Sequence, residues 1–84
     1  MLVPGAKQLK ERRIAENTSQ DQLAEDCGVR QATISNIETG KHRPSLELRE
    51  MFKERYGIDL DAWRTLAERK RLKRQAELRK AAAG

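Results

Sequence analysis

The fold is decided by one stretch of this sequence, which reads SQDQLAEDCGVRQATISNIETGK from Ser19 to Lys41. Ser19 is a good helix N-cap, and Gln22 three residues later completes the capping-box pattern that marks a helix start. Gly28 ends this helix. A second helix is predicted over about residues 31–38. The stretch is therefore predicted to form two helices joined by a short turn that contains a glycine.

Apolar residues at helical spacing give each of these two helices one inner face. Leu23, Ala24 and Cys27 lie on the inner face of the first helix, and the small Ala24 allows the helices to approach closely. Ile34 and Ile37 lie on the inner face of the second helix. Two helices connected in this way form a helix-turn-helix, whose second helix can enter the major groove of DNA.

A further helix is predicted before this unit, over about residues 6–16. Leu9 and Ile14 are its expected core contacts. Asn17 follows it, and asparagine tolerates the left-handed conformation that often ends a helix. The sequence therefore predicts three helices up to the end of the helix-turn-helix.

Two more helices are predicted after the helix-turn-helix. One covers about residues 46–56, and the other, capped by Asp59, covers about residues 60–80. The first half of the latter carries Trp63 and Leu66 at helical spacing, whereas charged residues dominate its second half. Alternation of apolar and polar residues is not sustained anywhere, so the fold is predicted to be all-α.

The charge of the chain is unevenly distributed. The 84 residues carry a formal net charge of +5. Residues 1–63 hold ten Lys or Arg and eleven Asp or Glu, a balance of −1, whereas residues 64–84 hold eight and two, a balance of +6. We expect a domain over residues 1–66, with the helix-turn-helix at about 19–38, and a basic helical or fraying tail over residues 67–84. Such a tail indicates a polyanionic partner.

The composition excludes several classes of protein. No apolar run of 18 or more residues is present, and no secretory signal is visible, so a cytoplasmic, nucleoid-associated protein is expected. The single cysteine, Cys27, rules out an internal disulfide framework and a multi-cysteine zinc site. The single histidine, His42, leaves little material for a metal cluster or a catalytic triad. We therefore expect no enzymatic activity, no catalytic residues, no cofactor and no metal.

With these residues in view, the sequence resembles the Xre/Cro family, the phage-repressor-like helix-turn-helix proteins. The family pattern is Thr-Gln-x-x-Leu-Ala, followed by Gly-Val, Thr-Ile-Ser, Ile-Glu, Gly-Lys and Pro-Ser, and it is matched at almost every position from Ser19 to Ser45. The resemblance covers about residues 7–63. It implies a compact five-helix DNA-binding domain, to which this chain adds a basic C-terminal helical extension.

The resemblance also implies roles for individual residues. Its base-reading positions correspond to Gln31, Ala32 and Asn36, and side-chain amides can pair with the adenine edge. Arg13 and Glu38 match a pair that forms a salt bridge between the first and third helices in some family members. Contacts with the DNA backbone are implied for Gln20, Ser35, Lys41, His42 and Arg43.

Two positions depart from the family pattern. Arg30 stands where Ser or Thr usually caps the recognition helix, and losing such a cap costs typically ~1 kcal/mol. A cation at a helix N-terminus is also disfavoured by the helix dipole. We therefore expect Arg30 to contact a base or a phosphate. Thr18 stands where leucine is commoner, so the turn before the helix-turn-helix is expected to be weakly anchored.

Three interpretations of the basic tail remain open at this point. It can be a solvated helix without a function, or a DNA arm that adds phosphate contacts and steepens the salt dependence of binding. As a dimerisation helix it would need a cleaner apolar seam than Leu66, Leu72, Ala76 and Leu78 supply.

These observations predict a sequence-specific DNA-binding transcriptional regulator, a prokaryotic or phage repressor or autoregulator. One such module reads only a few base pairs, so a homodimer on a two-fold operator is expected, with half-sites ~34 Å apart. No membrane partner is expected. The alternative is a protein-interaction adaptor or antitoxin-like protein, with an unknown protein partner and weak or tail-driven DNA binding.

Overall fold

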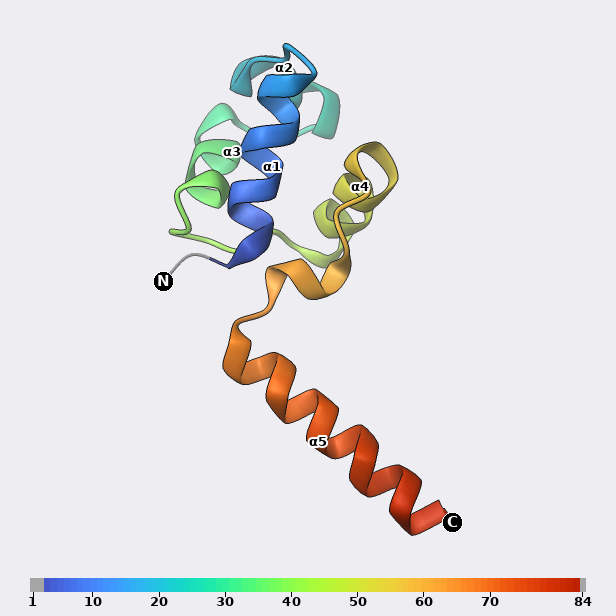
Figure 1. Ribbon diagram of the computed structural model, residues 1–84. Helices are drawn as coiled ribbons and strands as arrows, with labels where there is room; N and C mark the ends of the chain where they lie inside the picture. The colour runs from blue at the N-terminus through green and yellow to red at the C-terminus, as the bar shows by residue number, and fades with distance from the viewer. Residues whose placement is uncertain (1–2, 84) are drawn as a thin grey trace.

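The computed structural model describes residues 3–83, and their side chains as far as Leu78. These residues form five α-helices and one 3₁₀-helix, without a strand, as predicted. The helices are α1 (Pro4–Ala15), α2 (Gln20–Cys27), α3 (Gln31–Glu38), α4 (Leu46–Tyr56), the 3₁₀-helix η1 (Leu60–Trp63) and α5 (Leu66–Ala83). Figure 1 shows α1–α4 and η1 gathered into one body, from which α5 projects.

One hydrophobic core joins the four helices of the body to η1. Leu9 of α1, Leu23 of α2, Ile34 of α3 and Phe52 of α4 are fully buried in it, as is Trp63 of η1. The rings of Phe52 and Trp63 lie with their centroids 5.7 Å apart. The predicted inner faces of α2 and α3 are therefore confirmed, and this core fixes the back of α3.

Local residues end the helices near the positions that the sequence predicts. Asn17 adopts the left-handed conformation (φ 61°) between α1 and α2. The Ser19 hydroxyl accepts a hydrogen bond from the backbone N–H of Gln22 at 3.1 Å, as a cap should. Only half of the predicted capping box forms, because the Gln22 side chain donates to Asp26 at 2.9 Å instead of returning to the start of the helix.

The single helix predicted over about residues 60–80 is wrong, because the chain breaks between η1 and α5. Arg64 is extended (φ −102°, ψ 148°) and ends η1. Thr65 then caps α5: its hydroxyl oxygen accepts from the backbone N–H of Glu68 at 3.2 Å and donates to the Glu68 carboxylate at 3.1 Å. A Thr followed three residues later by Glu is itself a helix-start pattern, so the sequence did contain a signal for the break.

Ile14, an expected core contact, and Leu66, which the sequence places at helical spacing with Trp63, are both exposed. Ile14 is 57% exposed and Leu66 is 64% exposed. Leu9 and Arg13, one turn apart, lie on the buried face of α1. Ile14 directly follows Arg13 and is therefore rotated by ~100° away from this face. Leu66 begins α5, which leaves the body.

Helix α1 also begins two residues earlier than predicted, at Pro4, because proline is well suited to the first position of a helix.

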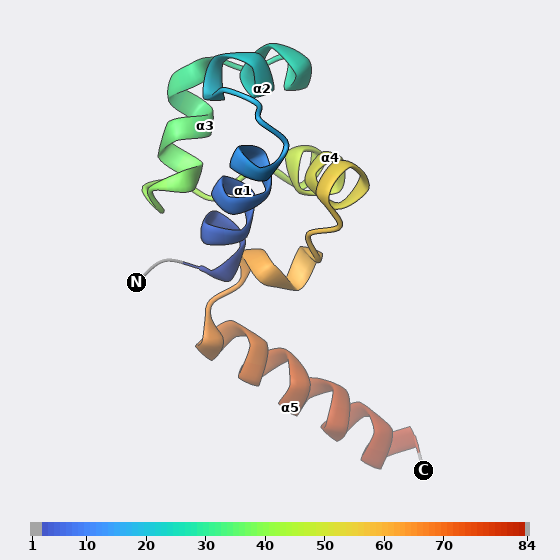
Figure 2. The same ribbon diagram turned by 45° about the horizontal axis from the view of Figure 1, so that its top comes forward.

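Helix α5 extends into solvent over most of its length. Figures 1 and 2 both show it leading away from the body, and the molecule measures 50 × 24 × 21 Å along its principal axes. Over the described residues, no helix is both long and apolar enough to cross a membrane. The extension is therefore a polar helix attached to the body by its first turn.

Candidate nucleic-acid interface

The turn between α2 and α3 sets the position of α3. Gly28 takes the left-handed conformation (φ 70°) that ends α2. The backbone N–H of Val29 then donates to the carbonyl of Ala24 at 2.9 Å, and the Val29 side chain packs against the core. Ile34 and Ile37 bury the back of α3. Its opposite face is consequently turned outward at the edge of the body (Figures 1 and 2).

The polar residues predicted to meet DNA share the outward face of α3. Gln31 and Ala32 are exposed, and Ser35 and Asn36 are half-buried one turn later. Residues at positions i, i+1, i+4 and i+5 lie on one side of a helix. The structure therefore brings two amides, one hydroxyl and one methyl group together on a single surface.

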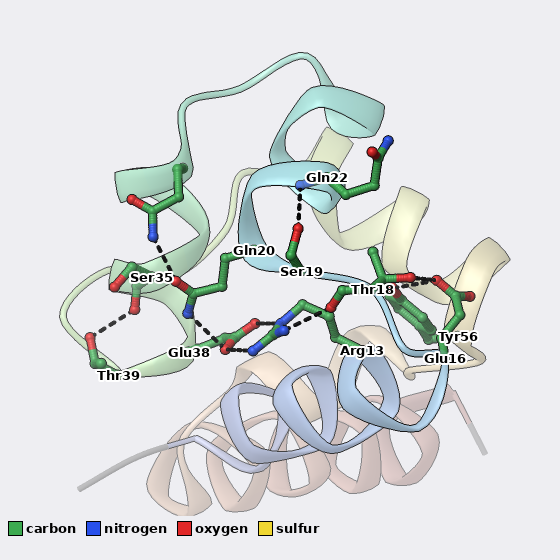
Figure 3. Close-up of polar contacts among 11 residues, drawn as sticks. Arg13, Glu16, Thr18, Ser19, Gln20, Gln22, Ser35, Glu38, Thr39 and Tyr56 are labelled. Atoms are coloured by element: carbon green, nitrogen blue, oxygen red, sulfur yellow. Dashed lines mark hydrogen bonds and ion pairs between the residues drawn. The ribbon is translucent and has the colours of Figure 1, made fainter.

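A buried ion pair ties α1 to the C-terminal end of α3. The Arg13 guanidinium donates to both carboxylate oxygens of Glu38, from Nε at 2.7 Å and from Nη2 at 3.0 Å (Figure 3). The two side chains are 11% and 2% exposed. The hydrogen bonds to Glu38 hold the pKa of Arg13 above its ordinary value, although burial opposes this shift. The orientation of α3 is thus fixed by a charged contact as well as by its apolar back.

Gln20, the first residue of α2, connects the two ends of α3. Its side chain donates to Glu38 at 3.1 Å and accepts a hydrogen bond from the Gln31 side chain at 2.6 Å. Figure 3 shows Gln20 pointing toward Glu38 and Arg13. A side-chain amide has two N–H donors and a carbonyl acceptor. Gln31 therefore keeps one N–H and its carbonyl oxygen for a further partner.

Thr18 makes polar contacts through its backbone and its side chain. Its carbonyl oxygen accepts from Nη1 of Arg13 at 2.8 Å, and its backbone N–H donates to the Arg13 carbonyl at 3.1 Å. Its hydroxyl donates to Glu16 at 2.8 Å (Figure 3). Only the hydroxyl contact depends on the threonine side chain, so the weaker anchoring of this turn stays a prediction.

The loop after α3 presents the three basic side chains that the sequence assigned to the DNA backbone. The backbone N–H groups of Lys41 and His42 both donate to the Asn36 carbonyl, at 2.9 Å and 3.3 Å, and this closes the end of α3. The side chains of Lys41, His42 and Arg43 are exposed. Arg43 also forms an ion pair with Glu68 of α5 at 2.6 Å, which the sequence did not predict.

Arg30 stands at the N-terminus of α3 without a capping role. Its backbone is extended (φ −81°, ψ 153°), and its side chain makes no capping hydrogen bond. The side chain is exposed beside the outward face of α3. The N-terminal turn of the recognition helix therefore lacks the side-chain cap that Ser19 and Ser45 supply to α2 and α4.

Sequence reasoning missed a second polar cluster, which is centred on Arg55 of α4. Its guanidinium pairs with Glu16 at 2.6 Å and with Asp26 at 2.8 Å. The Tyr56 hydroxyl also donates to Glu16, at 3.1 Å. The hydrogen bonds from Arg55 lower the pKa values of both carboxylic acids. This cluster connects α4 to Glu16 at the end of α1 and to Asp26 near the end of α2.

The other groups of chemical interest in the described residues are potential metal ligands and the Cys27 thiol. Within the described part of the chain, no group of three or more His, Cys, Asp or Glu residues is placed to hold a metal ion. Cys27 is half-buried beside the core, and this burial raises the pKa of its thiol. The arrangement instead offers a braced helix with an outward polar face and a basic loop at its end.

Comparison with known proteins agrees with this geometry. The family model described as Helix-turn-helix matches residues 9–63, which is more than half of the chain. No curated protein matches the chain. The matched region contains α2, α3 and the loop that follows them. The chain therefore belongs to the Xre/Cro-type helix-turn-helix family of DNA-binding regulators, whose members are not enzymes.

Proposed function

We propose that this protein is a sequence-specific transcriptional regulator, a prokaryotic or phage repressor or autoregulator, that acts in the cytoplasm on the nucleoid. The observation that carries the proposal is the outward face of α3, where Gln31, Ala32 and Asn36 lie together on a helix. The Arg13–Glu38 pair holds this helix from behind. A rigidly held helix loses little conformational freedom when it docks, which favours readout of a defined sequence.

Bases are read by three side chains of α3 in this proposal. The amides of Gln31 and Asn36 pair with the N6 and N7 edge of adenine, and the methyl group of Ala32 contacts a thymine methyl group. Arg30, exposed at the N-terminus of the same helix, reaches a base or a phosphate. These four positions account for only part of an operator.

The DNA backbone is held by residues that surround α3. Lys41, His42 and Arg43 project from the loop at its C-terminal end. Gln20 lies at the N-terminus of α2, where backbone N–H groups favour an anion. Ser35 lies on the face of α3 that meets DNA. In this proposal residues 1–66 carry the specificity, whereas residues 67–84 do not.

A homodimer follows from the small size of the reading surface. Two copies related by a two-fold axis would place their α3 helices in successive major grooves, ~34 Å apart. The operator would accordingly be an inverted repeat. Symmetry doubles the number of bases that are read without requiring a larger domain.

The experiment that tests this proposal is selection from random duplex DNA with the full chain, followed by a footprint on the selected site. An inverted repeat with two protected half-sites is expected. The variants Asn36→Ala and Gln31→Ala should each weaken binding to that site by ~5-fold to 150-fold, and leave binding to unrelated DNA unchanged. Gln22→Ala, which removes an exposed amide of α2 that is assigned no contact with DNA, is the matched control.

Two outcomes would contradict the proposal. Equal binding to every duplex would show that α3 reads no bases, and would favour the adaptor or antitoxin-like interpretation with tail-driven DNA binding. A single protected half-site would contradict the homodimer while leaving the role of α3 intact.

A further inference from the structure

Helix α5 is fastened to the body by polar contacts of its first turn. Glu68 pairs with Arg43 at 2.6 Å, and Nε of Arg69 donates to the Asp61 carbonyl at 3.1 Å. Arg64, one extended residue, separates Trp63 of the core from the cap of α5. The base of the helix therefore lies next to the basic loop after α3.

The leucines of α5 do not form an apolar face. Leu66, Leu72 and Leu78 follow one another at six-residue intervals and are 64%, 41% and 63% exposed. At 3.6 residues per turn, a spacing of six residues rotates each leucine by ~120° from the others. The three side chains thus point in three directions. A second copy of α5 would find no seam to pack against, and a membrane surface would find no apolar face to bury.

The cations of α5 are free to meet a polyanion. Lys70, Arg71, Lys73 and Arg74 are exposed. None of them forms an ion pair with any residue whose side chain the structure describes. At ~100° per residue these four positions cover an arc of ~160° on one side of the helix. They occupy consecutive turns and place four positive charges within a short length of α5.

We propose that α5 is a DNA-binding arm, whose basic side chains contact phosphates beside the site that α3 reads. This inference rests on the proposed function for its partner, because DNA is the polyanion that the body meets. Helix α5 has 18 residues and is therefore ~27 Å long, about four fifths of one ~34 Å turn of B-DNA.

The arm supplies affinity and not specificity. Phosphates carry the same charge at every base pair, so contacts from Lys70, Arg71, Lys73 and Arg74 strengthen binding to all duplexes equally. The body has a net charge of −1 over residues 1–63, so much of the general attraction to DNA must come from the +6 of residues 64–84. The chain thereby separates affinity and specificity between two parts.

The test compares two variants of the full chain. In the first, all four cations are replaced by glutamine, which removes the charges and keeps a good helix former at each position. In the second, each of the two lysines becomes arginine and each of the two arginines becomes lysine, so the charges are kept. The substitutions of this matched control are Lys70→Arg, Arg71→Lys, Lys73→Arg and Arg74→Lys. Affinity for the selected operator and for an unrelated duplex is measured by fluorescence anisotropy over a range of salt concentrations.

The glutamine variant should lose affinity for both duplexes by one factor, ~10-fold or more at low salt. Its plot of log affinity against log salt concentration should be shallower by ~0.9 for each phosphate that the arm no longer binds, and so by up to ~3.6. The ratio of the two affinities should stay unchanged. The control variant should bind like the original chain. Circular dichroism should show equal helix content in all three proteins.

Three results would contradict the proposal that α5 is a DNA-binding arm. Unchanged affinity and salt slope would make α5 a solvated helix. Loss of operator binding alone would make it a sequence reader. A change of oligomeric state in sedimentation that accounts for the lower affinity would make it a dimerisation helix. If the original chain binds both duplexes equally, the proposed function fails, but the two variants still decide the role of α5 on the unrelated duplex.

Discussion

Arg43 and Glu68 form an ion pair that joins the loop after α3 to the first turn of α5, with Nη1 of Arg43 2.6 Å from a carboxylate oxygen. Their side chains are 45% and 35% exposed. Hydrogen bonding from Arg43 lowers the pKa of Glu68 below its ordinary value, so the carboxylate is charged at neutral pH. A phosphate and this carboxylate compete for the same guanidinium. The basic loop and the basic helix are therefore coupled through one acidic side chain.

Replacing Glu68 with glutamine should strengthen DNA binding. The variant Glu68→Gln releases Arg43 for a phosphate, and glutamine can still serve in the helix-start pattern with Thr65. We expect a few-fold higher affinity and a salt slope steeper by up to ~0.9. Anisotropy titrations at several salt concentrations measure both. Glu77→Gln removes the same charge from α5 without touching Arg43. An equal gain in this control would assign the effect to net charge alone.

The features that the sequence predicted correctly are those encoded locally. Ser19 caps α2, Asn17 takes the left-handed conformation, and the apolar periodicity of α3 buries Ile34 and Ile37. Each depends on residues within one or two helical turns. Such patterns can be interpreted without knowing the fold, and the helix-turn-helix was predicted with its observed bounds for this reason.

The features that the sequence did not predict depend on residues far apart in the chain. Arg55 meets Glu16 across 39 positions, and no local spacing indicates such a pair. The pair between Arg43 and Glu68 likewise joins residues 25 positions apart, and no local spacing indicates it. The break at Arg64 is different, because its helix-start signal, Thr65 with Glu68, is local. Trp63 and Leu66 on either side of it also fit the spacing of one continuous helix, and this periodicity hides the break.

Gly5→Ala should destabilise the protein, although alanine is normally the better helix residue by ~0.5–1 kcal/mol. A Cβ at this position would lie 2.6 Å from ring atoms of Trp63, which is fully buried. Overpacking of a core typically costs 1–3 kcal/mol, so the free energy of unfolding should fall by ~1–2 kcal/mol. Urea denaturation followed by Trp63 fluorescence measures it. Lys7→Ala, exposed on the same helix, should cause no such loss.

Acid should remove the stabilisation that Arg55 provides. Its hydrogen bonds lower the pKa values of Glu16 and Asp26 from the ordinary values of 4.5 and 3.8. A lowered folded-state pKa stabilises the fold above the ordinary value, and this contribution disappears as the pH falls through the lowered value. The difference in unfolding free energy between the original chain and Arg55→Gln should therefore be larger at pH 6 than at pH 3.

A neighbouring arginine of α4 provides the control for this pH dependence. Arg49 donates to the Pro44 carbonyl at 2.9 Å, and this acceptor does not titrate. Arg49→Gln should consequently change the unfolding free energy by a similar amount at pH 6 and pH 3. If the effect of Arg55→Gln were equally independent of pH, its two carboxylate partners would contribute nothing through their charge.

Arg30→Ser should separate stability from DNA binding. Serine would supply the missing cap of α3 and remove a cation from the positive end of its dipole, so the free energy of unfolding should rise by ~1 kcal/mol. DNA affinity should fall, with a salt slope shallower by ~0.9 if Arg30 binds a phosphate. Arg30→Gln removes the charge without adding a good cap. It should weaken DNA binding to the same extent and raise the free energy of unfolding by less than Arg30→Ser does, because it removes the cation but supplies no cap. If Arg30→Ser stabilises the protein while affinity and slope stay constant, Arg30 does not touch DNA, and its place at the N-terminus of α3 has no functional cause.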